Sequence, residues 1–90
     1  MRTLAWTETA LNELAALWMS AKSAERSAIT KACAEVEKRI LAEPGSEGES
    51  RSHGLRIVFV SPLALTYHFD PTLDQVTVAR IRSSKSRKAP

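Results

Sequence analysis

Apolar residues in the first half of the chain recur at helical spacing. Residues 2–6 form a short apolar segment that predicts a first strand, and Thr7 is placed to cap the helix after it. Over residues 7–22 the apolar positions come at steps of three and four: Ala10, Leu14, Leu17, Trp18 and Ala21. This spacing predicts a helix with one buried stripe, in which Trp18, like Trp6 of the strand, fills the core.

Residues 23–43 repeat this pattern. Ser23 is a suitable N-cap, Pro44 and Gly45 end the segment, and the expected inward face consists of Ile29, Ala32, Cys33, Val36 and Ile40. Because the connection between the two predicted helices is very short, we expect them to form an antiparallel hairpin.

From Gly54 onward the period of the pattern changes to two. Alternating runs over residues 55–60, 63–69 and 75–82 are separated by Ser61-Pro62 and Asp70-Pro71, which predicts three consecutive antiparallel strands. The element order is β-α-α-β-β-β, so we predict an α+β fold: an antiparallel sheet with a helical hairpin packed on one face. The domain is expected to cover residues 1–82, followed by a basic tail at 83–90.

Length and composition indicate one small domain of 90 residues. No apolar run approaches the roughly 20 residues that span a bilayer, and the N-terminus lacks a signal-peptide pattern. Cys33 is the only cysteine, so no internal disulfide can form. These features predict a cytoplasmic protein without membrane contact.

The charge of the chain is concentrated in its second half. Residues 1–49 carry six Lys and Arg against eight Asp and Glu, a net −2, whereas residues 50–90 carry seven against two, a net +5. Such asymmetry indicates an anionic partner, either nucleic acid or an acidic protein segment, although a short basic tail is also common as a solvated end.

The pattern of His, Cys and Ser residues argues against several kinds of chemistry. Cys33, His53 and His68 lack the spacing of metal ligands, and no nucleophile-elbow or phosphate-loop motif occurs, so we expect neither a metal nor a cofactor. What remains is acid-base chemistry or electrostatic binding of a phosphodiester. Arg80 and Arg82 lie on one side of the last strand and, with Arg56, are expected to form a basic stripe, unless each is only a solvated surface residue.

The order and spacing of these segments resemble the RelE/ParE superfamily, the toxins of type II toxin-antitoxin pairs. The resemblance rests on "WTETALNELAALW", "ITKACAEVEKRILAEP", "GESRSHGLRIVF", "LALTYHF" and "QVTVARI". It implies a toxic surface on the sheet, growth inhibition, a role of the plasmid-stabilisation type in a bacterium, and neutralisation by a cognate antitoxin. In this resemblance Arg56 matches the arginine that opens the strand after the helices, and Tyr67 matches the aromatic residue of the middle strand.

Three positions depart from the ribosome-dependent endonucleases of that superfamily. Ala64 stands where an arginine is usual, Leu55 replaces a lysine before Arg56, and the C-terminus lacks an aromatic residue. The leading hypothesis is therefore a toxin that binds an essential target of the DNA gyrase type and is held inactive by its antitoxin, as a homodimer or as a hetero-oligomer with that antitoxin.

Two alternatives remain open. One is a messenger-RNA endonuclease acting on the ribosome, with Arg56 and Arg82 stabilising phosphate charge and His68 transferring protons. The other is an interaction module that keeps the fold without toxicity. The expected binding residues are Arg51, His53, Arg56, Arg80, Arg82, Lys85 and Arg87.

Overall fold

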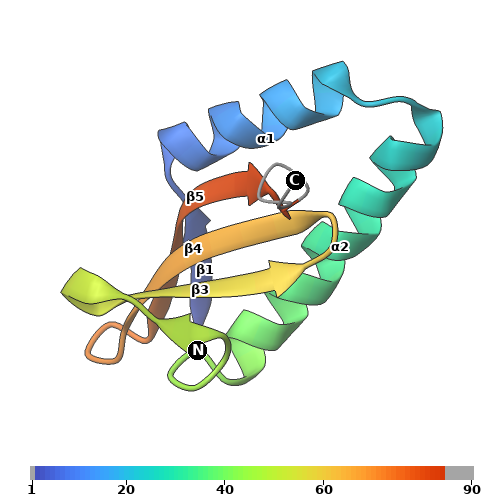
Figure 1. Cartoon of the computed structure of the whole chain (residues 1–90). Coiled ribbons are helices and arrows are strands. Elements are labelled where there is room, and N and C mark those ends of the chain that lie inside the picture. The colour runs from blue at the N-terminus through green and yellow to red at the C-terminus, as the bar shows by residue number, and fades with distance from the viewer. Residues whose placement is uncertain (1, 85–90) are drawn as a thin grey trace.

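The elements of the protein follow the predicted order (Figure 1). The computed structural model describes residues 2–84. The elements are β1 (Thr3–Trp6), α1 (Glu8–Ser20), α2 (Ser23–Ala42), β2 (Glu49–Ser50), a 3-10 turn (Ser52–Gly54), β3 (Leu55–Val60), β4 (Leu63–Asp70) and β5 (Gln75–Ser83). The predicted α+β class is confirmed, and the two-residue β2 is an addition to it.

The five strands form one mixed sheet in the order β1-β5-β4-β3-β2. β3, β4 and β5 pair antiparallel, as predicted, and β2 pairs antiparallel with β3, whereas β1 pairs parallel with β5 through residues Thr3 to Trp6, contrary to the wholly antiparallel sheet expected. A parallel pair needs a long crossover, which the two helices and the three following strands provide. Alternation along one strand does not specify its neighbour, so the sequence pattern did not reveal this pairing.

Both helices cover the same face of the sheet, but each covers a different part of it. α1 packs on β5, and α2 packs on β3 and β4, while the two helices diverge from their short connection (Figure 1). The buried core between the layers includes Val36, Ile40, Leu65, Tyr67, Val78 and Ile81. The opposite face of the sheet, called the outer face below, has no helix on it within residues 2–84.

The helix ends follow capping rules with one change from expectation. Thr7 Oγ1 accepts the N–H of Ala10 at 3.0 Å, which caps α1 as predicted. Lys22, not Ser23, is the N-cap of α2, and its backbone N–H donates to the Glu25 carboxylate at 2.8 Å. The glutamate side chain at the third helical position thus satisfies the N–H of the N-cap residue.

Trp18 does not fill the core, contrary to the prediction. Its side chain is 39% exposed, and the Arg26 guanidinium lies over its ring, 5.5 Å from the centroid. Trp6 does pack against the core, and its indole donates to the Glu37 carboxylate at 3.2 Å. Cys33 of α2 is half-buried, and burial raises the pKa of its thiol.

Candidate binding surface

A β-bulge decides which way the arginines of β5 point. Tyr67 pairs with Val78 and Thr66 with Arg80, so Ala79 is left as the extra residue. Simple alternation would have put Arg80 and Arg82 on the side of Val76 and Val78, which are buried under the helices. Beyond the bulge the phase is reversed, so Ile81 is buried and both arginines lie on the outer face.

The N-terminus of α1 holds this bulge in place. Thr7 Oγ1 donates to the carbonyl oxygen of Ala79 at 3.0 Å, and the Thr7 backbone N–H donates to Val78 at 3.0 Å. The same hydroxyl caps α1, so the start of the helix and the bulge share one side chain. The orientation of the arginines is therefore tied to the β1–α1 junction.

Glu13 of α1 binds both arginines of β5. Its Oε2 lies 2.8 Å from Arg80 Nε, 2.7 Å from Arg80 Nη2 and 3.4 Å from Arg82 Nε. Its Oε1 accepts the backbone N–H of Ile81 at 2.8 Å, at a part of β5 that extends beyond the end of β1. The hydrogen bond from Arg80 is the main cause that holds the pKa of the Glu13 carboxyl below its usual value, and the same contact raises the pKa of Arg80.

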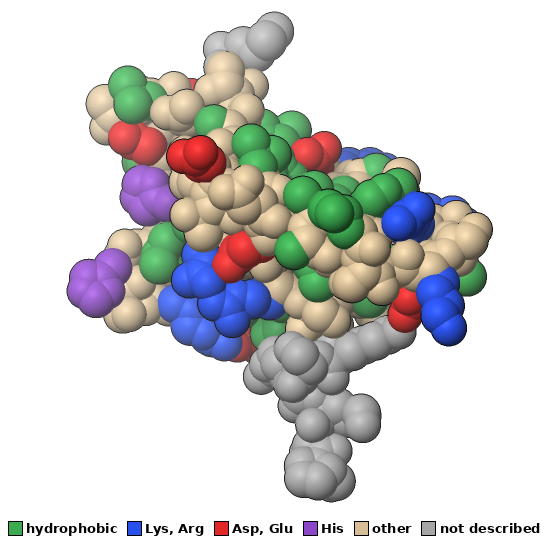
Figure 2. Space-filling model, turned by 90° about the horizontal axis from the view of Figure 1, so that it is seen from above, with side chains coloured by type: hydrophobic (Ala, Val, Ile, Leu, Met, Phe, Trp, Pro, Cys, Tyr) green, Lys and Arg blue, Asp and Glu red, His purple; other side chains and the backbone are tan. Residues whose placement is uncertain are grey.

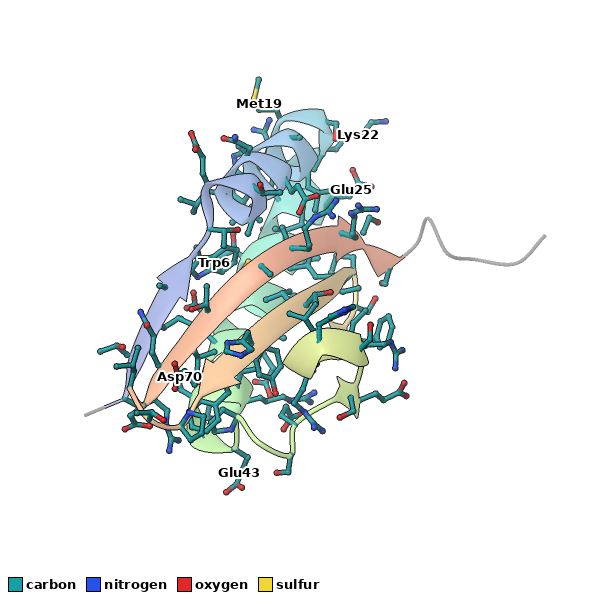
Figure 3. All side chains as sticks on the ribbon, turned by 90° about the vertical axis from the view of Figure 1, so that its left-hand side faces the viewer. Trp6, Met19, Lys22, Glu25, Glu43 and Asp70 are labelled. Carbon is teal, nitrogen blue, oxygen red and sulfur yellow. The ribbon has the colours of Figure 1, made fainter. Side chains whose placement is uncertain are left out.

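We call Arg80 and Arg82 the basic pair. Their side chains are 45% and 62% exposed, so both guanidinium groups reach solvent despite the contact with Glu13. Ala64 and Thr66 of β4 lie directly beside them, with α2 on the far side of the sheet (Figure 3). His68 is exposed on the same outer face, opposite Thr77 of β5.

Arg56 lies on the other face of the sheet, which corrects the expected basic stripe. Its direct neighbour on β4 is Tyr67, a fully buried core residue that faces the helices. The Arg56 guanidinium donates to the carbonyl oxygens of Glu47 at 2.7 Å and Gly48 at 3.0 Å, and to Ser50 Oγ at 3.3 Å. Arg56 thus holds the loop between α2 and β2.

Tyr67 of β4 also contacts the loop between α2 and β2. Its hydroxyl oxygen lies 2.9 Å from the carbonyl oxygens of both Pro44 and Glu47. Burial is the largest influence on this phenol and raises its pKa, while Arg56 acts in the opposite direction. Arg56 and Tyr67, the two residues singled out by the family resemblance, meet in a structural hydrogen-bond network.

The remaining predicted binding residues lie apart from the basic pair. Arg51 pairs with Glu49 at 3.1 Å, and His53 is exposed in the 3-10 turn with a φ of 63°. Both precede β3, whereas the basic pair is on β5. Lys85 and Arg87, together with most of the predicted tail, lie outside the described residues.

The three residues proposed for nuclease chemistry do not form one site. Arg56 is on the helix side, while His68 and Arg82 are on the outer face. Arg82 lies opposite Ala64, four residues along β4 from His68, which places the two about 13 Å apart. Arg56 is therefore separated from the other two by the sheet itself.

A second exposed surface lies on the helices and has an apolar character. Leu11, Trp18 and Met19 of α1 are 51%, 39% and 76% exposed, and Figure 2, which looks down on α1, shows apolar side chains gathered there. They border a groove between the helices whose other lining residues include Leu14, Ile29 and Cys33. We call Leu11, Trp18 and Met19 the apolar patch. The sequence pattern missed it because Leu11 and Met19 fall outside the single stripe expected for α1.

Solved structures with a similar fold come from bacterial toxin-antitoxin systems. A chain of the chromosomal ParDE system from P. aeruginosa matches with a TM-score of 0.68 and 19% identity, covering 92% of this chain and 96% of the other. A chain of the E. coli RelBE toxin-antitoxin complex matches with a TM-score of 0.63, 20% identity and coverages of 92% and 96%. A chain of the RelBE2 toxin-antitoxin complex from Mycobacterium tuberculosis matches with a TM-score of 0.66 and 19% identity, covering 91% of this chain and 96% of the other.

These matches define the chain as having the fold of RelE/ParE toxins, as the sequence resemblance implied. No protein-family model matches the sequence, and no curated protein does. Within residues 2–84 no helix is long and apolar enough to cross a membrane, and no group of three His, Cys, Asp or Glu side chains is placed to bind a metal ion.

Proposed function

We propose that this chain is the toxin of a type II toxin-antitoxin pair and that it stops growth by binding an essential target of the gyrase class. The observation that carries this proposal is the outer face, where the basic pair reaches solvent beside short side chains on β4. Guanidinium groups fixed on a rigid strand suit recognition of phosphate or carboxylate. The fold shared with solved ParE and RelE chains supports the assignment to toxins.

Binding is favoured over messenger-RNA cleavage because the candidate catalytic groups are dispersed. General acid-base catalysis requires the proton-transfer group within hydrogen-bond reach of the reacting atoms. Arg56 is engaged by the loop after α2 and lies on the opposite face of the sheet from His68 and Arg82. A binding surface needs only charge and shape, which the outer face supplies.

The proposed antitoxin would cover the apolar patch. Exposed apolar side chains on one helix are typical of a surface that a partner helix occupies. Arg26 and Lys31 line a hollow next to Trp18, so the partner segment is expected to be amphipathic and acidic at that end. The solved ParDE and RelBE structures are systems or complexes that include an antitoxin.

Induced expression in a bacterium tests the function. We expect growth arrest, with loss of gyrase supercoiling in vitro when the purified protein is added, and rescue by co-expression of a neighbouring short gene. Messenger-RNA cleavage on ribosomes during the arrest would instead support the endonuclease. Growth at the normal rate with soluble, folded protein would support an interaction module without toxicity.

The apolar patch has its own test. Met19→Glu places a charge at the most exposed position of the patch and is expected to leave growth arrest intact while abolishing rescue by the antitoxin. Leu73→Glu is a matched control, because Leu73 is 65% exposed in the β4–β5 turn and outside the patch. Equal rescue of the Met19 variant and the control would show that the antitoxin binds elsewhere.

A further inference from the structure

The contact of Glu13 with the basic pair has a consequence for binding. One carboxylate faces two guanidinium groups, so the cluster of three side chains carries a net charge of +1 in place of +2. Glu13 is only 21% exposed and accepts a backbone hydrogen bond from Ile81, so it is fixed in place and is not a passing surface contact. An approaching anion therefore meets a site whose charge is already half neutralised.

The geometry leaves donors for such an anion. Arg82 comes nearest to Glu13 through Nε, at 3.4 Å, and neither of its terminal nitrogens donates a hydrogen bond to that carboxylate. Arg80 uses Nε and Nη2, and its Nη1 is left in the same way. Since Arg80 and Arg82 are two residues apart on one strand, their side chains leave the sheet about 7 Å apart, with Thr66 on the neighbouring strand.

We propose that Glu13 acts through the basic pair as an internal counter-ion, and that it sets the affinity and salt dependence with which the outer face binds the phosphodiester backbone of a nucleic acid. This inference goes beyond the proposed function: it concerns the same surface, gives it a nucleic-acid ligand, and stands or fails independently of growth arrest. Glu13 keeps the two guanidinium groups in one orientation and at the same time weakens their attraction for phosphate. Because Glu13 weakens the attraction of each arginine for phosphate, we expect only ligands that contact both arginines at once to bind.

Glu13→Gln tests the inference. Glutamine retains an oxygen that can accept the Ile81 N–H but carries no charge, so the basic pair regains its full charge of +2. We expect the variant to bind a single-stranded oligonucleotide about three- to fivefold more tightly at low salt, from one unit charge acting at contact distance near solvent. The slope of log K against log salt is expected to steepen by about 0.7.

Glu43→Gln is the matched control. Glu43 is exposed at the C-terminal end of α2, and Figure 3 shows it at the opposite end of the molecule from α1. The Glu43→Gln substitution changes the net charge of the protein by the same amount as Glu13→Gln, but we expect it to alter the affinity for the oligonucleotide less than twofold. Equal effects of the two variants, or weaker binding by Glu13→Gln, would overturn the inference.

A second measurement covers the case in which Glu13→Gln folds poorly. In the wild-type protein, addition of the same oligonucleotide is expected to shift the side-chain Nε–H resonances of Arg80 and Arg82 in NMR spectra, while that of Arg56 stays unchanged. Shifts confined to other arginines would overturn the inference. If the wild-type protein arrests growth but Glu13→Gln binds the oligonucleotide no more tightly than wild type, the inference fails and the proposed function stands. If Glu13→Gln binds more tightly but the wild-type protein does not arrest growth, the proposed function fails and the inference stands.

Discussion

Two arginine environments on one sheet differ in almost every respect. Arg56 faces the helices and makes two hydrogen bonds to the loop after α2 and one to Ser50 of β2, while Arg80 and Arg82 face away from the helices and remain about half exposed. Residue type is the same in both places, but the first environment binds the backbone of a loop and the second leaves the guanidinium groups exposed to solvent. The face on which a guanidinium lies, more than its presence, decides its role.

The largest expected effect in this comparison is that of Arg56→Ala on stability. Removal of the guanidinium takes the Arg56 donor from the carbonyl oxygen of Gly48 and leaves that of Glu47 with the Tyr67 hydroxyl alone. Hydrogen bonds to charged groups contribute about 1.5–3 kcal/mol, so we expect the free energy of unfolding to fall by about 2–3 kcal/mol in urea titrations. Arg82→Ala, the control on the outer face, should change it by less than about 0.5 kcal/mol. Equal losses for both variants would erase the distinction.

Tyr67→Phe is expected to have the next largest effect. The ring keeps its place in the core, but the hydroxyl that lies between Pro44 and Glu47 is lost. A buried group left unsatisfied costs about 1–3 kcal/mol, so we expect a loss of about 1–2 kcal/mol, measured by thermal or urea unfolding. The double variant with Arg56→Ala should show less than the sum, because both side chains hold the same loop. Full additivity would contradict a shared network.

The pH dependence of Glu13 gives the smallest effect. The pKa of this carboxyl is lowered in the folded protein, so its contribution to stability is fully present above its unfolded value of about 4.5 and is lost as pH falls through the lower folded value. We expect wild type to be more stable than Glu13→Gln at pH 6–7, and the two stabilities to converge as the pH falls below 4.5 and through the lowered folded pKa. A difference that is constant across this range would show that the charge of Glu13 does not stabilise the fold.

Much of the fold follows from the spacing of apolar residues, because the periods of 3.6 and two arise directly from helix and strand geometry. Val36 and Ile40 are buried as that spacing requires, and Thr7 caps α1 as its residue type predicts. The parallel pairing of β1 with β5 is not encoded in any single segment, since it depends on how the strands are arranged in space.

The proposed binding surface was harder to predict because it depends on one irregular residue. The bulge at Ala79 moves Arg80 and Arg82 to the outer face, and strict alternation along β5 gives the opposite result. Arg56 was expected to share their face, but its alternation partners Val58 and Val60 belong to the core side of β3. Glu13 gave no signal in the sequence, because its role arises from a contact 67 residues away.

Growth after induced expression of the double variant Arg80→Ala, Arg82→Ala tests the central claim most directly. The surface ion pairs with Glu13 contribute about 0–1 kcal/mol, so the variant should fold and accumulate like wild type. The account predicts that cells expressing it keep growing, while wild-type protein at the same soluble level stops growth. Growth arrest of equal strength by the folded double variant would contradict the assignment of the outer face as the binding surface.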